Sequence, residues 1–527
     1  MRHFAPLSMA IVLAAVCAPG ASARVLRVGS LHGVSGQYRS IQAAVEAARA
    51  GDWILVGPGD YKERADHRRH RGPQPADTPA GLVITKAGIH LRGMSRNAVV
   101  VDGTRPGSSR CSARRADQDF GPRGRRGQAR LGRNGILVWK ARNVWVQNLT
   151  VCNFLGGSGN AGNEIWWNGG DGSYRVGGHG YLGTSLSTTS TFFAGERTAA
   201  KYGLLTSNWS GGRWDRVYAS NLNDSGFYIG ACQQVCDQTV DHAHGQYNAL
   251  GYSGSNSGGQ LVVENSEFDH NKEGVDTNSQ NGDNPPPQNG ACRQGGVSPI
   301  THTHSCWVFM HNFVHDNNNP NVPYLGLAGS GPVGTGMSVS GGRNDTIMEN
   351  RFVNNGAWGV IFVPFLDSGG PCIGGTRGAL GKGSCLYDEW GDALVGNTFT
   401  HNGFYGHPSN GDIAELNVQG GHPTDCYRAN HDGAGALTSS PLELEQAHPA
   451  CDGAPAAANL TPTFLDEVLC NSEVEPSPGV PSPCPTGQYP RRKRVILHRL
   501  PRQATMPDPC QGVPVNAWCP VRRRGRR

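Results

Sequence analysis

Short apolar runs, broken by glycine and asparagine, recur along most of the chain. Residues 25–28 alternate apolar and polar side chains, and residues 52–61 form an apolar run that ends in a tight Gly-Pro-Gly turn. Similar runs follow at 82–84, 89–93 and 99–103. Runs this short, bounded by turn residues, predict β-strands rather than helices.

One segment near the start departs from this pattern and predicts a short helix over residues 40–51. Ser40 can cap the first turn of this helix, and Gly51 can end it. Its apolar positions recur at helical spacing: Ile41, Ala44, Val45 and Ala48. Together they would form one face that packs against the strands.

An asparagine template recurs through the middle of the chain. Its copies are Asn148–Asn153, Asn312–Asn317, Asn350–Asn355 and Asn397–Asn402, with Ser266–Asn271 as a variant. The last three copies begin 38 to 47 residues apart. Self-similarity of this kind predicts a solenoid. Stacked turns would place asparagine above asparagine along a corner, and inward Phe, Val and Leu would form one continuous core.

The predicted helix and the strand after it carry a family resemblance. Residues 40–45, followed by Gly51-Asp52 and then by 56–61, resemble the entry of pectate-lyase-like right-handed β-helices. In that family the helix caps the open end of the solenoid, where core side chains and unpaired backbone would otherwise meet water. The resemblance covers residues 25–425. It implies an all-β fold, a single-stranded right-handed parallel β-helix with an N-terminal capping helix.

Three regions are predicted along the chain. Residues 1–23 combine a basic start, an apolar stretch and an Ala-Ser-Ala cleavage site, which indicates a secretory signal peptide too short to span a membrane. Residues 24–429 would form the β-helix. Residues 430–527 are Pro-rich and Cys-paired, and predict an irregular extension that ends in a basic, disordered tail at 521–527. We therefore expect a secreted protein, extracellular or at the cell surface, and a monomer.

Cysteine usage agrees with secretion. Of the 15 cysteines, Cys17 leaves with the signal peptide, and an even number remains. Neighbouring cysteines suggest local disulfides that staple loops to the body: Cys111/Cys152, Cys232/Cys236, Cys292/Cys306, Cys372/Cys385, Cys426/Cys451, Cys470/Cys484 and Cys510/Cys519.

The net charge of +6 hides a strong segregation of charge. Residues 104–133 carry nine Arg against two Asp, and residues 490–527 carry eleven Arg or Lys against one Asp. Such runs are usually solvated. They could also attract a polyanion such as an acidic polysaccharide. No nucleic-acid partner is expected, because the chain is secreted and the runs lack interleaved aromatic residues.

Candidate catalytic groups follow the ends of predicted strands. Asp276 and Asp283 are spaced as paired carboxylates that could serve as acid and base, and Arg343 falls at a comparable strand end. His242 and His304 belong to two His-x-His pairs, and either could act as a general base. In polygalacturonase-like β-helices an Asn-Thr-Asp signature is catalytic, but this chain has the reverse order at 276–278, so no role carries over.

Candidate substrate-binding groups lie in a Gly-rich segment that we expect to be a loop. Trp166 and Trp167 could stack on sugar rings, with Glu164 as a hydroxyl acceptor. Asn278 would add a contact beside Asp276. The carboxylates could instead hold Ca²⁺. No metal ligand is assigned, because the histidine pairs match no known zinc spacing.

These features favour a polysaccharide-active protein, a lyase or glycoside hydrolase on acidic glycans. An epimerase on a similar scaffold is a lesser alternative. The main alternative is a non-catalytic extracellular protein that binds carbohydrate or cell wall, or serves a structural role at the surface.

Overall fold

The protein is described from a computed structural model. It covers residues 23–67, 74–124, 129–195, 198–232, 235–282, 285–324, 326, 328–379, 381–451, 453–471 and 489–521. The predicted signal peptide, apart from Ala23, and the end of the basic tail, residues 522–527, lie outside this part. None of the helices within it has the length and apolar character needed to cross a bilayer.

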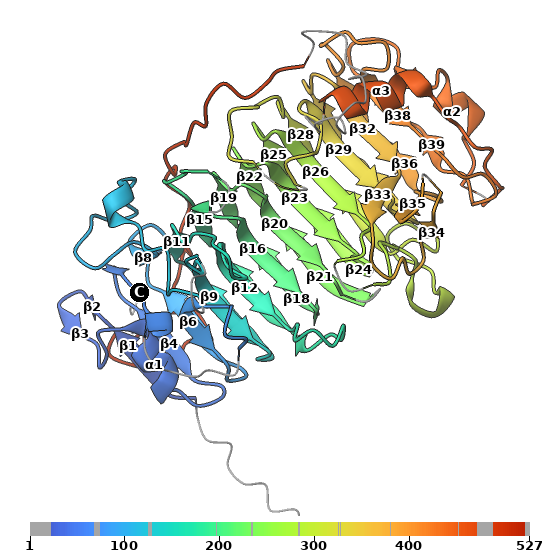
Figure 1. The fold of residues 1–527 in the computed structure, drawn as a ribbon. Coiled ribbons are helices and arrows are strands. Elements are labelled where there is room, and N and C mark those ends of the chain that lie inside the picture. The colour runs from blue at the N-terminus through green and yellow to red at the C-terminus, as the bar shows by residue number, and fades with distance from the viewer. Residues whose placement is uncertain are drawn as a thin grey trace, which may run out of the picture.

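Three long parallel sheets run the length of the molecule (Figure 1). Sheet 1 contains, in spatial order, β1 (Val25–Val28), β4 (Trp53–Val56), β7 (His90–Gly93), β10 (Val144–Gln147), β14 (Tyr181–Thr184), β18 (Gly212–Asp215), β21 (Val235–Asp241), β24 (Gly259–Glu264), β27 (Trp307–Met310), β30 (Asp345–Met348), β36 (Ala393–Val395) and β39 (Cys426–Arg428). Sheet 2 contains β5 (Gly59–Tyr61), β8 (Val99–Asp102), β11 (Thr150–Cys152), β15 (Ser187–Thr189), β19 (Tyr218–Ser220), β22 (His244–Gln246), β25 (Glu267–Asp269), β28 (Phe313–His315), β31 (Arg351–Val353), β37 (Thr398–Thr400) and β40 (His431–Asp432). Sheet 3 contains β6 (Ala80–Ile84), β9 (Asn134–Trp139), β12 (Asn163–Asn168), β16 (Tyr202–Ser207), β20 (Ser225–Gly230), β23 (Leu250–Ser255), β26 (Glu273–Asn278), β29 (Thr335–Ser340), β32 (Trp358–Val363), β38 (Gly411–Glu415) and β41 (Ser439–Ser440).

The remaining elements decorate these sheets. They are the hairpin β2 (Ser30–Leu31) and β3 (Val34–Ser35), the pair β13 (Gly178–His179) and β17 (Trp209–Ser210), the antiparallel group β33 (Phe365–Ser368), β34 (Thr376–Arg377) and β35 (Ser384–Tyr387), the helices α1 (Ile41–Ala47), α2 (Leu444–Ala447) and α3 (Pro462–Asn471), and the 3-10 turns η1 (Ala65–His67), η2 (Arg115–Asp117) and η4 (Arg293–Gly295).

The chain visits sheets 1, 2 and 3 in turn and then returns to sheet 1, and each strand pairs in parallel with its counterpart one turn away. Parallel connections of this kind wind right-handedly. The protein is therefore a right-handed parallel β-helix, as the sequence predicts. Inward side chains stack in columns and join one apolar core, for example Phe268, Val314, Phe352 and Phe399 on sheet 2.

Helix α1 adds to the N-terminal end of this core. The Ser40 hydroxyl accepts a hydrogen bond from the Ala43 N–H, the cap that the sequence predicts. The helix is shorter than expected, ending at Ala47 rather than at Gly51. Its apolar face contacts β1, β4 and β6 and belongs to the core, so it extends the column of apolar side chains beyond the first turns.

Two asparagine ladders run along neighbouring corners, and both lie towards the C-terminal end. The first ladder lies at the corner between sheets 1 and 2 and runs through Ser266, Asn312, Asn350, Asn397 and Asn430. The backbone N–H group of each of the first four residues donates to the side-chain oxygen of the next residue in the ladder. A second ladder between sheets 2 and 3 joins Asn248, Asn271, Asn317, Asn355 and Asn402. Interior amides here satisfy buried backbone donors one turn away.

The predicted first copy of the template, Asn148–Asn153, is out of register by one residue. Because β11 begins at Thr150, the position equivalent to the ladder asparagines is Leu149, which is fully buried in the core. Asn148 instead adopts a left-handed backbone conformation and donates from its side chain to the Gly93 carbonyl. An apolar residue thus occupies the ladder position in this early turn.

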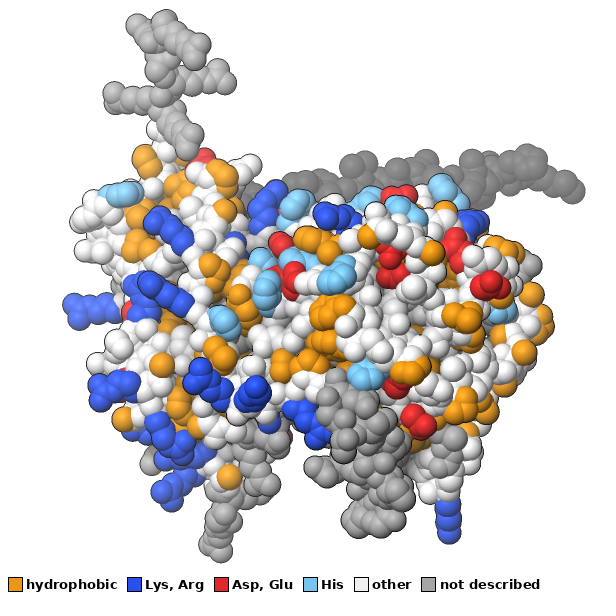
Figure 2. Space-filling model, turned by 90° about the horizontal axis from the view of Figure 1, so that it is seen from above, with side chains coloured by type: hydrophobic (Ala, Val, Ile, Leu, Met, Phe, Trp, Pro, Cys, Tyr) orange, Lys and Arg blue, Asp and Glu red, His pale blue; other side chains and the backbone are white. Residues whose placement is uncertain are grey.

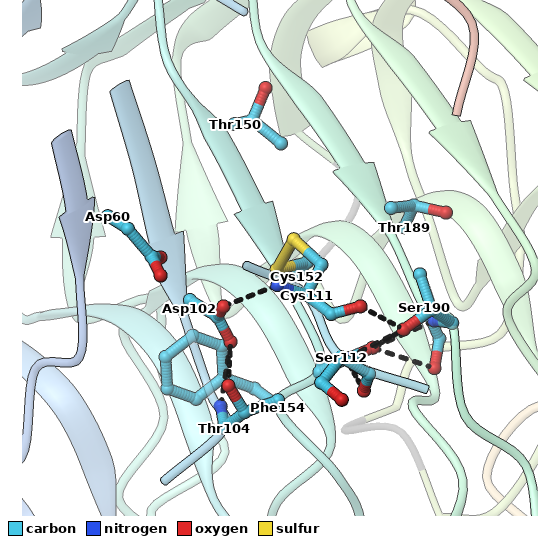
Figure 3. The surroundings of a disulfide bond; sticks show 12 residues. Asp60, Asp102, Thr104, Cys111, Ser112, Thr150, Cys152, Phe154, Thr189 and Ser190 are labelled. Carbon is cyan, nitrogen blue, oxygen red and sulfur yellow. Dashed lines mark hydrogen bonds between the residues drawn. A yellow bond between two sulfur atoms is a disulfide. The ribbon is translucent and has the colours of Figure 1, made fainter. Parts of the chain in front are cut away.

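Six of the predicted disulfides are present: Cys111–Cys152, Cys232–Cys236, Cys292–Cys306, Cys372–Cys385, Cys426–Cys451 and Cys510–Cys519. The predicted partner of Cys470, Cys484, lies outside the described residues. Figure 3 shows the Cys111–Cys152 bond beside Asp102, whose carboxylate accepts hydrogen bonds from the Cys111 backbone and from Thr104. This bridge holds the basic loop after β8 against β11.

The C-terminal segment returns along the whole solenoid (Figure 1, red). Its backbone is held by side-chain amides: Asn221 exchanges two hydrogen bonds with His498, and Asn97 does the same with Gln503. Trp518 then packs on the outer face of sheet 1 against Trp53 and Leu55. Residues 496–519 therefore form an ordered strap, whereas the sequence indicates only an irregular extension.

Candidate functional site

A groove opens on the outer face of sheet 3, the face turned towards the viewer in Figure 1. Its volume is about 220 Å³. The floor is formed by outward side chains of β20, β23, β26 and β29, and the walls come from residues 328–332, from Pro364-Phe365 and from Val468 of α3. The polar groups that line it are Asp224, Ser253, Ser255, Glu273, Asp276, Asn278, Gln280, Ser330, Ser338 and Ser340, and two tyrosines, Tyr202 and Tyr228, also line it.

Asp276 lies at the centre of this floor and points outward from β26. Its Oδ1 accepts hydrogen bonds from the hydroxyls of Ser338 (2.7 Å) and Ser340 (2.9 Å), and its Oδ2 accepts one from Asn278 (2.7 Å). The strand geometry explains the arrangement: Asp276 and Asn278 are two residues apart on one face, and Ser338 and Ser340 are their register partners on β29.

Glu273, at the start of β26, is the second carboxyl group of the groove. It is fully buried, and its Oε1 lies 2.5 Å from the Ser338 hydroxyl oxygen. Its Oε2 is buried without a hydrogen-bond partner among the described residues. The Ser338 hydroxyl therefore lies between one oxygen of Glu273 and one oxygen of Asp276, so the two carboxyl groups are neighbours in the groove.

The two carboxyl groups differ in how well their charged forms are stabilised. Burial raises the pKa of Glu273 well above its ordinary value, and the negative charge of Asp276 raises it further. Burial also raises the pKa of Asp276, but the hydrogen bonds from Ser338, Asn278 and Ser340 oppose that rise. The Ser338 hydroxyl has a single hydrogen and can donate to only one of the two carboxyl groups. If it donates to Asp276, the short contact between Glu273 Oε1 and Ser338 requires a proton on Glu273, which agrees with the raised pKa of Glu273.

The loop over Glu273 depends on a glycine. A Cβ atom at Gly331 would lie 1.8 Å from Glu273 Oε2. The neighbouring Lys272 is also buried, and its ammonium group donates to the carbonyls of Gly329 and Gly331. The loop therefore packs directly on the buried carboxyl group and excludes water from one side of it.

Of the catalytic residues predicted from the sequence, Asp276 lies in the groove together with Asn278. Asp283 lies outside the described residues. Arg343 is not among the groove residues: its guanidinium donates to the carbonyls of Asp388 and Gly374 and lies over the Trp390 ring. Burial lowers its pKa. The structure thus does not bring Arg343 and Asp276 into one site.

The predicted loop around Trp166 and Trp167 is wrong, because these residues lie in strand β12. Trp167 points inward and is fully buried in the core. Trp166 is 4% exposed and donates from its indole to Ser207. Glu164 is fully buried, accepts from the Phe154 N–H, and has a pKa that burial raises well above its ordinary value. None of the three presents a free surface to a sugar, since all three are buried within the continuous sheet 3.

The two His-x-His pairs do not form shared faces. His242 lies at a corner in a left-handed conformation with its ring against Asp241 (2.6 Å), whereas His244 lies in β22. His304 is exposed, and its Nδ1 lies 2.9 Å from the Gly296 carbonyl oxygen. A residue at a bend does not follow the alternation of side chains along a strand, so the two histidines of a pair need not lie on one face. Neither His242 nor His304 is among the residues that line the groove.

Within the described residues, three side-chain groups have the geometry for a metal ion: Asp102, Cys111 and Cys152; Asp215, Asp241 and His242; and His244, Glu267 and Asp269. The first holds no thiolate, because its cysteines form a disulfide. The groove carboxylates are not among these groups.

Sequence reasoning missed Glu273 and Ser338 as site residues. The signal for the serines is weak: Ser338 and Ser340 alternate along a strand, but only the parallel register brings them beside a carboxylate more than sixty residues earlier.

No protein-family model matches the chain, and no curated protein matches its sequence. Among solved structures, it is similar to the A-module of mannuronan C-5 epimerase AlgE4 from Azotobacter vinelandii, at 15% identity over 74% of this chain and 90% of that one, with a TM-score of 0.43. It is also similar to a rhamnogalacturonan lyase (13%; 71% and 82%; 0.44) and to an alginate lyase from Paenibacillus sp. str. FPU-7 (12%; 79% and 97%; 0.35). At such identities and TM-scores these likenesses carry no argument about activity, and the fold rests on the strand pairing itself.

Proposed function

We propose that the protein is a secreted glycoside hydrolase that binds a polysaccharide along the groove on sheet 3. The observation that carries this proposal is the pair Glu273 and Asp276, which share the Ser338 hydroxyl at the centre of a groove lined by hydroxyl and amide groups. Such groups match the hydroxyls of sugars, and Tyr202 and Tyr228 offer aromatic rings.

Each carboxyl group takes one role. Asp276, stabilised as an anion by three hydrogen bonds, is the nucleophile that attacks the anomeric carbon. Glu273, which holds a proton, donates it to the leaving glycosidic oxygen. In the second step the Glu273 carboxylate removes a proton from water, which attacks the glycosyl–Asp276 ester and releases the sugar. Two displacements retain the configuration at the anomeric carbon.

Hydrolysis is favoured over elimination and epimerisation by the charge of the groove. No lysine or arginine is found among its described lining residues. Abstraction of a proton next to a uronate carboxylate needs a base and a positive charge to stabilise the developing anion. The groove supplies carboxyl groups instead, so we expect it to bind neutral stretches of a glycan rather than uronate-rich ones.

The test is incubation of the protein with a panel of neutral and uronate-containing polysaccharides. New reducing ends without absorbance from unsaturated sugars are expected on at least one neutral polysaccharide, and Asp276→Asn should remove this activity. Glu349→Gln is the matched control, since Glu349 is an exposed carboxylate paired with His311 on another face. Unsaturated products from a uronate polymer would contradict hydrolysis.

The second candidate function is binding of carbohydrate without cleavage. It is favoured by one observation: Glu273 has no exposed surface, so a sugar reaches it only if residues 328–332 move. Retained binding to a polysaccharide, with no new reducing ends and with affinity that drops in Asp276→Asn, would establish this function instead.

A further inference from the structure

A second group of polar side chains lies on the outer face of sheet 2, outside the groove. Figure 2 shows histidine and acidic side chains side by side near the middle of one face. We call this group the histidine–acid cluster; it consists of His244, Gln246, Glu267, Asp269, His270 and His315. Three adjacent strands, β22, β25 and β28, supply most of it.

The two carboxylates of the cluster are oriented in the same way. Asp269 Oδ2 meets His270 Nδ1, and Asp269 Oδ1 lies 2.6 Å from His244 Nε2. Glu267 Oε1 lies 3.1 Å from His315 Nε2, and Glu267 Oε2 lies 4.0 Å from His244 Nε2. Each carboxylate thus gives one oxygen to an outer histidine and turns the other towards His244. One donor atom from each of His244, Glu267 and Asp269 lies within 4.8 Å of the other two.

Two side chains contact His244 Nε2, and the orientation of the Gln246 amide decides how they fit together. The carboxylate oxygen of Asp269 at 2.6 Å requires a proton on Nε2, whereas the amide nitrogen of Gln246 at 2.8 Å requires a lone pair there. Rotation of the Gln246 amide presents its oxygen instead, and an Nε2–H then faces two acceptors. In that orientation three side chains direct oxygen or nitrogen lone pairs to one point, and a metal ion in place of the proton would be bound by all of them.

We propose that the histidine–acid cluster binds one divalent first-row transition-metal ion through His244 Nε2, Asp269 Oδ1 and Glu267 Oε2. One imidazole with two carboxylates suits ions such as Zn²⁺ better than Ca²⁺, which prefers oxygen ligands alone. His270 and His315 are positioning residues, since they hold the far oxygens of the two carboxylates.

The site is open to the solvent. The side chains of His244 and Glu267 are 30% and 44% exposed, so an ion can enter directly and retain a position for water or a ligand oxygen. The ion would join β22 to β25, which are neighbouring turns of the solenoid. It does not depend on the groove, which lies on a different sheet.

The test is titration of the full mature chain with Zn²⁺ after removal of metals by a chelator, followed by calorimetry. One tight Zn²⁺ site is expected, and His244→Gln and Asp269→Asn should each weaken it at least about tenfold. His431→Gln is the control, because this histidine lies on the same sheet outside the cluster, with its Nε2 3.1 Å from the Thr398 hydroxyl. The Zn²⁺ affinity of this variant should stay within about twofold of wild type.

Two further measurements separate loss of a ligand from loss of the fold. Glu267→Gln changes a half-exposed side chain. The variant should therefore unfold at the same thermal midpoint as the wild type in the absence of metal, and its affinity for Zn²⁺ should be lower. Bound Co²⁺ should give visible ligand-field absorption that is lost in His244→Gln. Equal Zn²⁺ affinity in His244→Gln and wild type would overturn the proposal, as would binding that is lost only in His242→Gln, which would place the ion at Asp215, Asp241 and His242 instead.

Discussion

Two carboxyl pairs occupy successive strands of one turn and behave in opposite ways. On β25, the hydrogen bond from His315 lowers the pKa of Glu267, and hydrogen bonds from His244 and His270 outweigh burial to lower the pKa of Asp269 to about 2. On β26, burial raises the pKa values of Glu273 and Asp276. The two pairs have the same chemistry, but their neighbours differ: histidines on sheet 2, serines and an overlying loop on sheet 3.

This difference in pKa suits the two carboxyl pairs to two different functions. A pair held ionised offers lone pairs to a cation, whereas a pair that retains a proton can donate it in catalysis. The β-helix makes this possible because its three sheets present outward faces that do not share neighbours, even for residues close in sequence.

The largest expected effect is on cleavage by the β26 pair. Asp276→Asn should lower the rate of polysaccharide cleavage by about 10²–10⁴-fold, because the amide cannot act as a nucleophile. Release of reducing ends measures this rate. Asp269→Asn, the equivalent change on β25, should leave the rate near wild type, and a comparable loss in both variants would erase the functional distinction between the pairs.

The next effect is on metal affinity at the β25 pair. His315→Gln should weaken the affinity for Zn²⁺ by about 10–100-fold, because Glu267 Oε1, the oxygen that faces away from the ion, loses its histidine partner. Glu273→Gln should leave Zn²⁺ affinity unchanged. Calorimetric titration of both variants measures the effect, and the reverse result would show that the two sites are misassigned.

A smaller effect is expected from the loop over Glu273. Gly331→Ala places a methyl group against Glu273 Oε2 and should cost about 1–3 kcal/mol in the free energy of unfolding. Gly295→Ala is a useful control for loss of a glycine, since its Cβ would meet no atom within 4 Å, although its positive φ adds some strain of its own. Denaturant unfolding of both variants compares them; equal losses would show that the contact with Glu273 is unimportant.

The smallest effect concerns pH. The pKa of Glu273 is raised above its ordinary value of 4.5, so its contribution to stability is fully present below that pH and is lost as the pH rises through the folded-state pKa. Asp276, Lys272 and the groove residue Asp224 face the same region. Glu273→Gln cannot ionise, so it should lose less stability than wild type as the pH rises from 5 to 8. Thermal unfolding across this range measures this difference; an opposite slope would show that Glu273 is stabilised as an anion.

The fold could be predicted from local signals, because a capped helix and a repeated asparagine template each report a specific backbone arrangement. The register of the first copy of the template, Asn148–Asn153, could not be predicted, because Asn148 and the ladder asparagines have similar neighbours in the sequence. Trp166 and Trp167 were assigned to a loop because glycines surround them, although they form a strand of the continuous sheet 3.

The sites were harder to predict than the fold. Asp276 could be identified because it is a carboxylate near the end of a predicted strand, although it lies within β26 rather than after it. Its hydroxyl partners and the histidines around Asp269 come from strands one or more turns away, and only the pairing register brings them together. The strap over sheets 1 and 2 was missed for a related reason: single asparagines dock its backbone and leave no repeat in the sequence.

The most direct test of the opposite behaviour of the two pairs is difference infrared spectroscopy at pH 7. Subtracting the spectrum of Glu273→Gln from that of wild type should reveal the C=O stretch of a protonated carboxyl group. The same subtraction for Asp269→Asn should reveal only ionised carboxylate bands. A protonated band that is missing from the Glu273 difference, or that appears in the Asp269 difference, would contradict the account.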